Sequence, residues 1–127
     1  MDCIQACKNC FTACERCASE CLREADTEMT RCIELNLVCA DACAFTEREI
    51  ARESDRAQKI ALLCAKICGA CLEECNRHRL RCCVACAEAC RECARLCRQM
   101  AGLKKSKAAE QCSTFDAAAA LLDRHAV

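Results

Sequence analysis

Cysteines recur along this chain at a spacing that suits metal binding or disulfide formation. The 127-residue sequence holds 20 of them, and from Cys3 to Cys21 successive cysteines are four, three, four, three and four positions apart. An α-helix turns once every 3.6 residues, so this alternation places their side chains on one face of a helix. The spacing therefore predicts a helix with a continuous stripe of thiols.

Three further segments continue this period, and we call the four cysteine-bearing faces seams. We expect helices over residues 2–24, 28–52, 55–78 and 80–101. The seam cysteines are Cys3, Cys7, Cys10, Cys14, Cys17, Cys21, Cys32, Cys39, Cys43, Cys64, Cys68, Cys71, Cys75, Cys83, Cys86, Cys90, Cys93 and Cys97, which leaves Cys82 beside its seam and Cys112 beyond the last helix.

The rest of the composition favours long helices. The chain has no proline and two glycines, and it is rich in alanine, leucine, arginine and glutamate. The expected helices are joined by short connections, which makes consecutive helices antiparallel neighbours. We therefore predict an all-α protein in which residues 1–101 form an antiparallel up-and-down four-helix bundle with a cysteine-lined core.

Capping residues indicate where these helices begin and end. Asp26 or Thr27 suits the start of the second helix, and Ser54 suits the start of the third. Gly102 suits the C-terminal cap of the fourth helix, because glycine adopts the left-handed conformation that such a cap requires.

A core lined with thiols can hold disulfides or metal ions. Packing alone does not account for it, because cysteine buries less apolar surface than the leucine that bundles ordinarily use. Residues four apart on a helix have Cβ atoms about 5–6 Å apart, whereas a disulfide requires about 3.5–4.5 Å. Disulfides within a helix would be strained, while a bundle with disulfides between helices, or a thiol redox protein, stays an alternative.

Metal ions suit the same spacing better. Two thiolates on opposite sides of one ion, each about 2.3 Å from it, stand about 4.6 Å apart. Neighbours four residues apart on a helix can reach that separation, so each CxxxC sequence is a candidate two-coordinate site. Nine such pairs occur in register: Cys3/Cys7, Cys10/Cys14, Cys17/Cys21, Cys39/Cys43, Cys64/Cys68, Cys71/Cys75, Cys82/Cys86, Cys86/Cys90 and Cys93/Cys97.

The ligand set favours a soft monovalent metal. No seam carries a carboxylate between its cysteines and the chain has two histidines, whereas zinc takes four ligands and readily mixes these types. Iron–sulfur clusters need about four thiolates each, and the regular stripe marks out no such groups. An all-thiolate interior that tolerates low coordination favours Cu(I). A zinc-binding protein is a second alternative, beside the redox or disulfide-linked bundle.

The number of thiols predicts storage. With two thiolates per ion the cysteines would bind about ten Cu(I) ions, and about 20 if every sulfur bridges two ions. A catalytic or electron-transfer site needs no such capacity. The sequence also shows no nucleophile paired with a base, which is the pattern that would indicate an enzyme. We therefore expect high-capacity storage and sequestration of Cu(I) and no catalysis.

Charge and hydropathy limit the partners and the compartment. Nineteen basic and nineteen acidic residues cancel, which argues against binding to nucleic acid or to anionic membrane surfaces. The sequence begins without a signal-peptide pattern, and no run approaches about 18 apolar residues. Thiols stay reduced in the cytosol. We expect a cytoplasmic protein that binds neither nucleic acid nor membranes.

Three stretches resemble the bacterial four-helix-bundle copper storage proteins, in the cytosolic branch that lacks an export signal. They are MTRCIELNLVCADACAFT (Met29–Thr46), CAKICGACLEECNRH (Cys64–His78) and CCVACAEACRECARLCRQM (Cys82–Met100). The resemblance implies a homotetramer of bundles, each with many Cu(I) ions bound by thiolates along its core. Phe11 and Phe45 are candidates for the contacts between subunits.

The resemblance also implies that copper enters through one end of the bundle. We expect Met29 and His78 as ligands at that end, in addition to the seam cysteines and Cys82. Such a store implies a copper chaperone or a recipient cuproenzyme as a partner. In an up-and-down bundle, the end in question gathers Cys21, Met29, Cys32, Cys75, His78, Cys82 and Cys83.

Several residues near the seams are not expected to bind copper. Asn36 and Thr46 interrupt the second seam, and we expect them to hydrogen-bond locally. At the end opposite His78, the topology gathers apolar residues that we interpret as a plug, namely Ile50, Ile60, Met100 and Leu103.

The C-terminal tail, residues 102–127, departs from the pattern of the bundle. A basic linker leads to residues 114–124, which we predict to form a short helix. Cys112 and His125 lie in this tail, and we do not expect them to belong to the core site.

Overall fold

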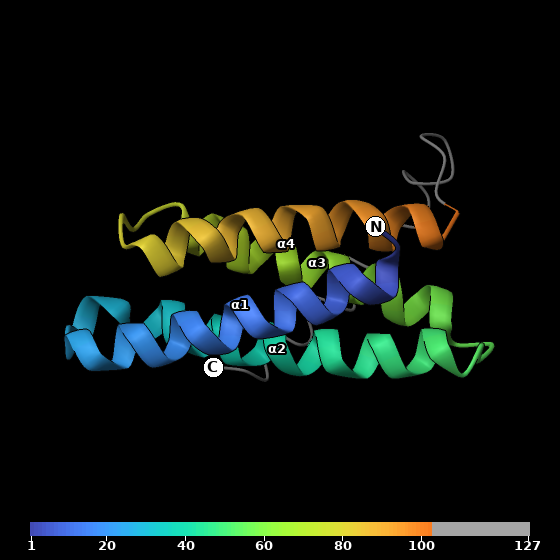
Figure 1. Ribbon diagram of the computed structural model, residues 1–127, viewed down its shortest axis with the longest axis horizontal. Helices are drawn as coiled ribbons and strands as arrows, with labels where there is room; N and C mark the ends of the chain where they lie inside the picture. Colours follow the sequence, from blue (N-terminus) through green and yellow to red (C-terminus); the bar gives the residue numbers. More distant parts are fainter. Residues whose placement is uncertain (103–127) are drawn as a thin grey trace.

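The fold is an antiparallel four-helix bundle, which confirms the predicted fold class (Figure 1). The computed structural model describes residues 1–102, and every regular element in that part of the chain is helical. The elements are α1 (Cys3–Glu24), the short 3₁₀ helix η1 (Thr27–Met29), α2 (Thr30–Ala51), α3 (Ala57–Cys75) and α4 (Arg81–Met100).

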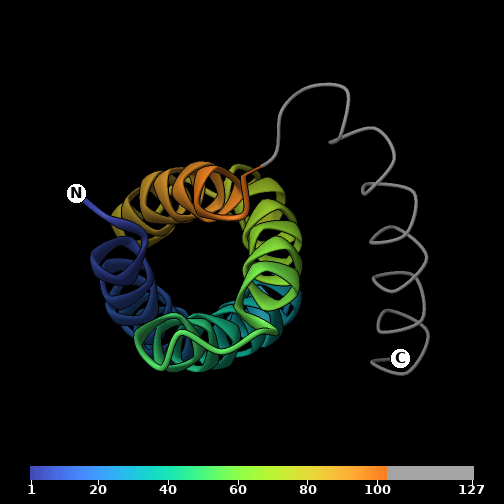
Figure 2. The ribbon, with the colours of Figure 1, turned by 90° about the vertical axis from the view of Figure 1, so that its right-hand side faces the viewer.

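The four long helices stand in a ring. Seen along the bundle axis, α1, α2, α3 and α4 follow one another around the circle (Figure 2), and each helix packs against the two beside it. One end of the bundle therefore holds the α1–α2 and α3–α4 connections, and we call it the mouth. The other end holds the N-terminus, the α2–α3 connection and the end of α4, and we call it the closed end.

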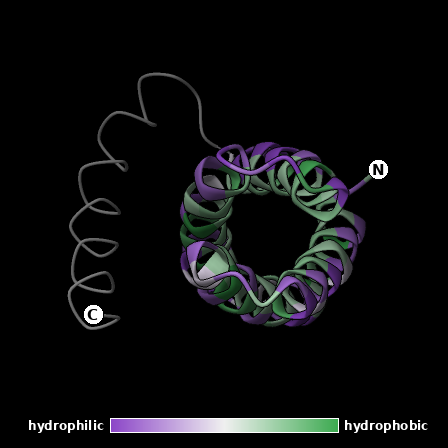
Figure 3. Ribbon diagram, turned by 90° about the vertical axis from the view of Figure 1, so that its left-hand side faces the viewer, coloured by the Kyte–Doolittle hydropathy of each residue, from purple (hydrophilic) through white to green (hydrophobic). Residues whose placement is uncertain are grey.

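The interior of the ring is built from cysteine and alanine. Hydrophilic residues cover the outside of the helices and hydrophobic ones face inward (Figure 3). Each seam faces the axis, and buried alanines flank the seams, among them Ala6, Ala61, Ala65, Ala87 and Ala94. Because these side chains are small, the helices approach closely and the core is filled with sulfur.

Side-chain caps fix the first two helical starts. The Asp2 carboxylate accepts a hydrogen bond of 2.9 Å from the Gln5 N–H at the start of α1. Asp26 does the same for the Glu28 N–H at 3.0 Å, as its position in the sequence predicts. The turn that it caps is η1, so α2 proper begins at Thr30, two residues later than expected.

The start of α3 differs from the prediction. Ser54 does not cap the helix, which begins at Ala57 after Arg56 and has no side-chain cap. The Ser54 hydroxyl instead donates a hydrogen bond of 3.3 Å to the carboxylate of Glu49, which is buried at the end of α2. The buried carboxylate therefore takes the hydroxyl that would otherwise cap α3, because an unpaired charge at this buried position would be costly.

The end of α4 agrees with the sequence. Gly102 has a φ of 71°, and its N–H bonds to the Gln99 carbonyl at 2.9 Å, as a C-terminal cap requires. The predicted helix over residues 114–124 lies outside the described residues, as do Leu103, Cys112 and His125. Within residues 1–102, none of the helices combines the length and the hydropathy needed to cross a membrane.

Candidate metal centre

The thiols are free and turned inward. All 19 cysteines in the described part of the chain are unpaired, and 18 of them are buried. These 18 are the seam cysteines, whereas Cys82 is half-buried. Cysteines four residues apart on one helix bring their sulfurs to 3.9 Å in the pairs Cys10/Cys14, Cys17/Cys21, Cys86/Cys90 and Cys93/Cys97.

Sulfurs on different helices come equally close. Cys3 of α1 lies 3.2 Å from Cys97 of α4, and Cys14 lies 3.5 Å from Cys86 on the same pair of helices. Diagonal contacts also occur across the ring, such as Cys39 of α2 to Cys90 of α4 at 3.9 Å. Many thiols, such as Cys10 and Cys14, therefore meet partners on other helices as well as on their own.

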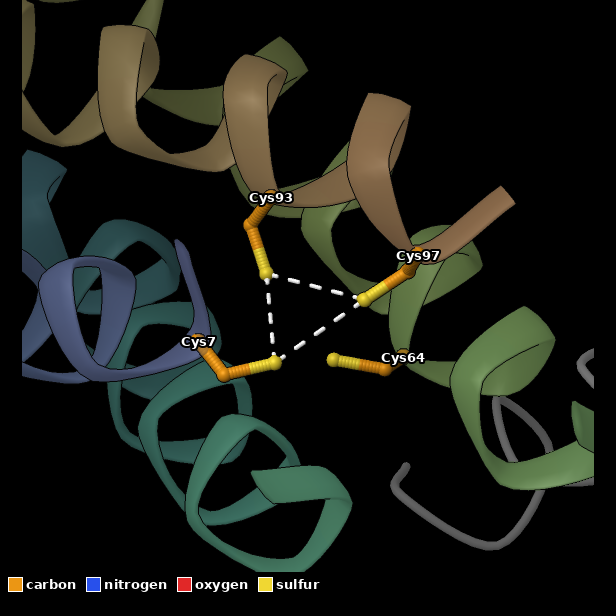
Figure 4. A group of neighbouring side chains, drawn as sticks. All are labelled: Cys7, Cys64, Cys93 and Cys97. Atoms are coloured by element: carbon orange, nitrogen blue, oxygen red, sulfur yellow. Dashed lines mark hydrogen bonds between the residues drawn. The ribbon is translucent and has the colours of Figure 1, made fainter. Parts of the chain in front are cut away.

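The result is a chain of four-sulfur groups along the axis. Figure 4 shows one of them, in which Cys7 of α1, Cys64 of α3 and Cys93 and Cys97 of α4 point toward a common centre. Within each group the sulfurs lie within 4.8 Å of one another. Further groups are Cys10/Cys39/Cys43/Cys68, Cys10/Cys14/Cys39/Cys90, Cys14/Cys71/Cys86/Cys90 and Cys17/Cys21/Cys82/Cys83.

The expectation that the stripe marks out no groups of four thiolates is wrong. It treated each helix alone, whereas each group draws ligands from two or more helices. A group of four thiols satisfies the ligand count of zinc, so the number of ligands alone does not distinguish a zinc site from a copper site. The sharing of ligands does favour copper, because Cys10, Cys14, Cys39 and Cys90 each belong to two groups. A shared thiolate bridges ions and builds a continuous array.

Burial keeps the thiols of Cys21 and Cys83, near the mouth, protonated. Removal from water is the leading cause that raises the pKa of both Cys21 and Cys83, and the neighbouring thiols raise it further because a second thiolate would be repelled. Both groups are therefore neutral at physiological pH. A metal ion that binds here must displace their protons.

The mouth gathers the cysteines that the topology predicts. Cys21, Cys82 and Cys83 share one group, and Cys32 lies 3.9 Å from Cys75. Met29, at the end of η1, is buried in the same core cluster with 5% of its surface exposed.

His78 lies beside the mouth, just after α3, and its side chain is 15% exposed. Its Nε2 lies 2.8 Å from the carboxylate of Glu74, one turn earlier, and Arg77 also contacts this carboxylate. An ionised carboxylate accepts hydrogen bonds only, so Nε2 carries the proton and a neutral ring leaves its lone pair on Nδ1. Carboxylates orient metal-binding histidines in this way.

Asn36 makes the expected local bond and also bonds across the core. Its Nδ2 donates to Cys32 Sγ at 3.6 Å, one turn away, but its other bonds cross the core. Its Oδ1 accepts from Cys71 at 3.2 Å and from Cys86 at 3.4 Å. The expected local bond also occurs at Thr46, whose hydroxyl donates to the Ala42 carbonyl at 2.7 Å.

The closed end combines an apolar contact with an ionic cluster. Ile50 and Met100 pack against the core, as the plug interpretation predicts, and Ile60 is half-buried. Beside them the buried Glu49 accepts bonds from Arg56 at 3.1 Å and Arg52 at 3.4 Å.

The sequence interpretation missed both buried carboxylates. Glu74 could have been found from its spacing, because it stands four residues before His78 on the same helical face. Glu49 gave a weaker signal, since two of its partners, Ser54 and Arg56, belong to the next connection and its burial depends on the turn between α2 and α3.

A helical bundle whose interior is an array of shared cysteine groups defines a class of protein, the multi-site thiolate metal binders. The chain belongs to the copper storage protein family, whose sequence model matches residues 1–102.

Individual relatives agree with this assignment. The cysteine-rich protein YhjQ of Bacillus subtilis (strain 168), itself uncharacterized, is 43% identical over 88 residues, which are 68% of this chain and 82% of that protein. The Cu(I)-bound copper storage protein BsCsp3 of the same species is 43% identical with a TM-score of 0.75, over 78% of this chain and 94% of that one. A cytosolic copper storage protein from Streptomyces lividans, solved with five coppers, is 33% identical with a TM-score of 0.74, over 80% and 91%.

Proposed function

We propose that this protein stores and sequesters Cu(I) ions on the thiolates of its bundle core. The observation that carries the proposal is the series of four-sulfur groups in the core, several of which share cysteines. Cu(I) prefers soft thiolate ligands and accepts low coordination numbers. Two solved relatives in the same family contain copper in the same fold.

The ligands in this proposal are the 18 seam cysteines and Cys82, with Met29 and His78 added at the mouth. The buried position of Met29 and the Glu74 contact of His78 support their assignment. With two thiolates per ion, and with sulfurs bridging neighbouring ions, the capacity is about 10–20 Cu(I) ions per chain.

The proposed role is to buffer copper, either for cuproenzymes or as protection against excess metal. A store of this kind carries out no chemical conversion, and we assign no catalytic residue. We place it in the cytoplasm, supported by the cytosolic relative from Streptomyces lividans. A copper chaperone or a cuproenzyme is the partner that would deliver or receive the metal.

We also propose that the bundles assemble as a homotetramer. The outer faces of α2 and α3 enclose a groove of about 1000 Å³ whose apolar lining includes Leu35, Leu63 and Ile67. Val38 on its rim is 49% exposed, and Phe45 on α2 is 50% exposed. Light scattering should give the mass of four chains for the natural protein and a lower mass for Val38→Glu.

The test of storage is an anaerobic Cu(I) titration of fully reduced protein against a chromophoric competitor, with bound metal counted after desalting. Storage requires about 10–20 tightly held ions per chain. The same titration with Zn(II) should saturate at or below about four or five ions.

The alternatives give different results in this experiment. A zinc protein would retain about four or five ions of either metal. A redox protein would bind few ions and would instead form disulfides on mild oxidation, which thiol counting before and after oxidant detects. Saturation with Cu(I) below about five ions would overturn the storage proposal.

A further inference from the structure

Cys82 differs from every other cysteine in the described part of the chain. It is half-buried, whereas the remaining 18 are buried. It occupies the first turn of α4, beside the seam and directly before the buried Cys83. A reagent that arrives from solution at the mouth can therefore reach its sulfur before it reaches the others.

The Cys82 sulfur is nonetheless in contact range of the core array. It forms a group with Cys17, Cys21 and Cys83, in which all four sulfurs lie within 4.8 Å of one another. Cys17 and Cys21 come from α1, and their sulfurs are 3.9 Å apart. A copper ion bound to Cys82 is thus within one exchange step of three buried thiols.

The surroundings of Cys82 are cationic. The connection between α3 and α4 carries Arg77 and Arg79, and α4 begins with Arg81; all three are exposed, and Arg77 pairs with Glu74. Glu73 and Glu74 at the end of α3 offset part of this charge, while the connection between α1 and α2 carries the acidic Asp26 and Glu28. An anionic donor is therefore attracted to the side of the mouth on which Cys82 lies.

We propose that Cys82 is the thiol that first accepts copper, and that its donor is an anionic Cu(I) complex of a small thiol. This inference rests on the proposed storage function. In the first step, the Cys82 sulfur bonds to the Cu(I) ion of a bis-thiolate complex, one donor thiolate leaves, and it takes the Cys82 proton as it departs. Copper stays in the +1 state throughout.

Two further exchanges carry the ion inward. The thiol of Cys21 displaces the second donor thiolate, which takes the Cys21 proton as it leaves. Copper is then bound by the sulfurs of Cys82 and Cys21. The thiol of Cys17 then replaces Cys82, and its proton returns to the Cys82 sulfur. Cys82 is thereby free to accept the next ion.

The test measures the rate of copper transfer from the Cu(I)–glutathione complex to reduced apoprotein in an anaerobic stopped-flow instrument. Cys82→Ser should slow the initial transfer by about tenfold or more, because access to the attacking sulfur sets the rate of thiolate exchange. Its final capacity should fall by no more than about one ion. Ala85→Ser, on the exposed face of the same helix, should transfer copper at the natural rate.

A second comparison separates the position of the thiol from the loss of a ligand. Cys3→Ser removes one thiol at the closed end, so its initial rate should exceed that of Cys82→Ser by about tenfold. Arg79→Gln should also lower the transfer rate and weaken its dependence on salt. Arg16→Gln, on the outer face of α1, is the control for that change.

The outcomes are distinct. Equal initial rates in Cys82→Ser and Cys3→Ser would overturn the role of Cys82 while leaving storage intact, since both variants would still load many ions. A natural protein that retains fewer than about five ions would overturn storage itself. Circular dichroism of each variant confirms that the bundle has formed before rates are compared.

Discussion

At the scale of single residues, shared cysteines are the most consequential. Cys10 belongs to two four-sulfur groups, and its sulfur lies 3.7 Å from Cys90, 3.8 Å from Cys39 and 3.9 Å from Cys14. A thiolate in this position bridges ions in adjacent groups. Its removal therefore affects more than one binding position.

We predict that Cys10→Ser lowers the capacity by about one to two Cu(I) ions per chain. It should also lower the free energy of unfolding of the apoprotein by about 1–3 kcal/mol, because a hydroxyl is buried in place of a thiol. Metal counting and urea unfolding measure the two effects. Thr12→Ala, an exposed change two residues away, is the control, and a capacity equal to that of the natural protein would contradict the bridging role.

Asn36 stands where the second seam would otherwise carry a cysteine. Its amide faces Cys71 and Cys86, at the level where the mouth groups meet the inner groups. We predict that Asn36→Cys raises the capacity by about one ion, because it adds a soft ligand beside these thiols.

The matched control for this change is Leu37→Cys, which places the same thiol on the exposed side of α2. It should bind no additional ion that survives desalting against the competitor. Similar capacities for the two variants would mean that the interior position of residue 36 has no special importance.

At the scale of elements, the connection between α2 and α3 is held by the buried Glu49. Burial of this carboxyl group by itself raises its pKa, but hydrogen bonds from Arg56, Ser54 and Arg52 outweigh burial and the pKa is lowered. Because the pKa of Glu49 is lower in the folded state than in the unfolded chain, its ionised form stabilises the bundle at pH values above the unfolded pKa. The contribution is lost as the pH falls through the folded pKa.

We therefore predict that the natural protein loses more stability than Glu49→Gln between pH 7 and about pH 3. Thermal unfolding of the apoprotein at both pH values gives the comparison. Glu47→Gln, whose partner Lys8 is largely exposed, is the control and should follow the natural protein. Parallel loss of stability in the natural protein and Glu49→Gln would contradict the assignment.

The sequence predicts these elements well where local pattern decides them. The period of the cysteines identifies four helices and the face of each that is buried, and the Asp26 and Gly102 caps follow from residue type. The start of α3 was not predictable, because Ser54 is drawn to a carboxylate whose burial depends on the turn. The four-sulfur groups were not predictable either, because they depend on how four helices are rotated against one another.

At the scale of the whole molecule, we expect the bundle to fold without metal. Four amphipathic helices bury their seams against one another, so we predict a helical apoprotein. Circular dichroism of reduced, metal-free protein should show a spectrum typical of α-helices, with little change when copper binds. A spectrum that becomes helical only on addition of copper would instead indicate metal-coupled folding.

The buried thiols make the apoprotein sensitive to alkali. The pKa of Cys21 and of Cys83 is raised in the folded state above the ordinary value of 9.0. Their contribution to stability is complete below that value and is lost as the pH rises toward the folded pKa, because unfolded thiols ionise first.

We predict that the free energy of unfolding of the reduced apoprotein falls between about pH 8 and pH 11. Copper-loaded protein should not show this fall, because its thiols have already lost their protons to the metal. Urea unfolding in oxygen-free buffer across this range measures both. An apoprotein whose stability is unchanged by alkali would contradict the raised pKa values.

The two ends of the bundle differ, and this difference has a consequence for the order in which copper ions are bound and released. The Glu49 cluster and the packing of Ile50 and Met100 close one end, while Cys82 opens to solvent at the other. The helices between them are about 30 Å long, so we expect ions to move along the core in single file and not to pass one another. With entry at Cys82 as proposed, we expect the copper that is deposited first to lie deepest and to leave last, so that the time an ion has spent in the protein follows its distance from the mouth.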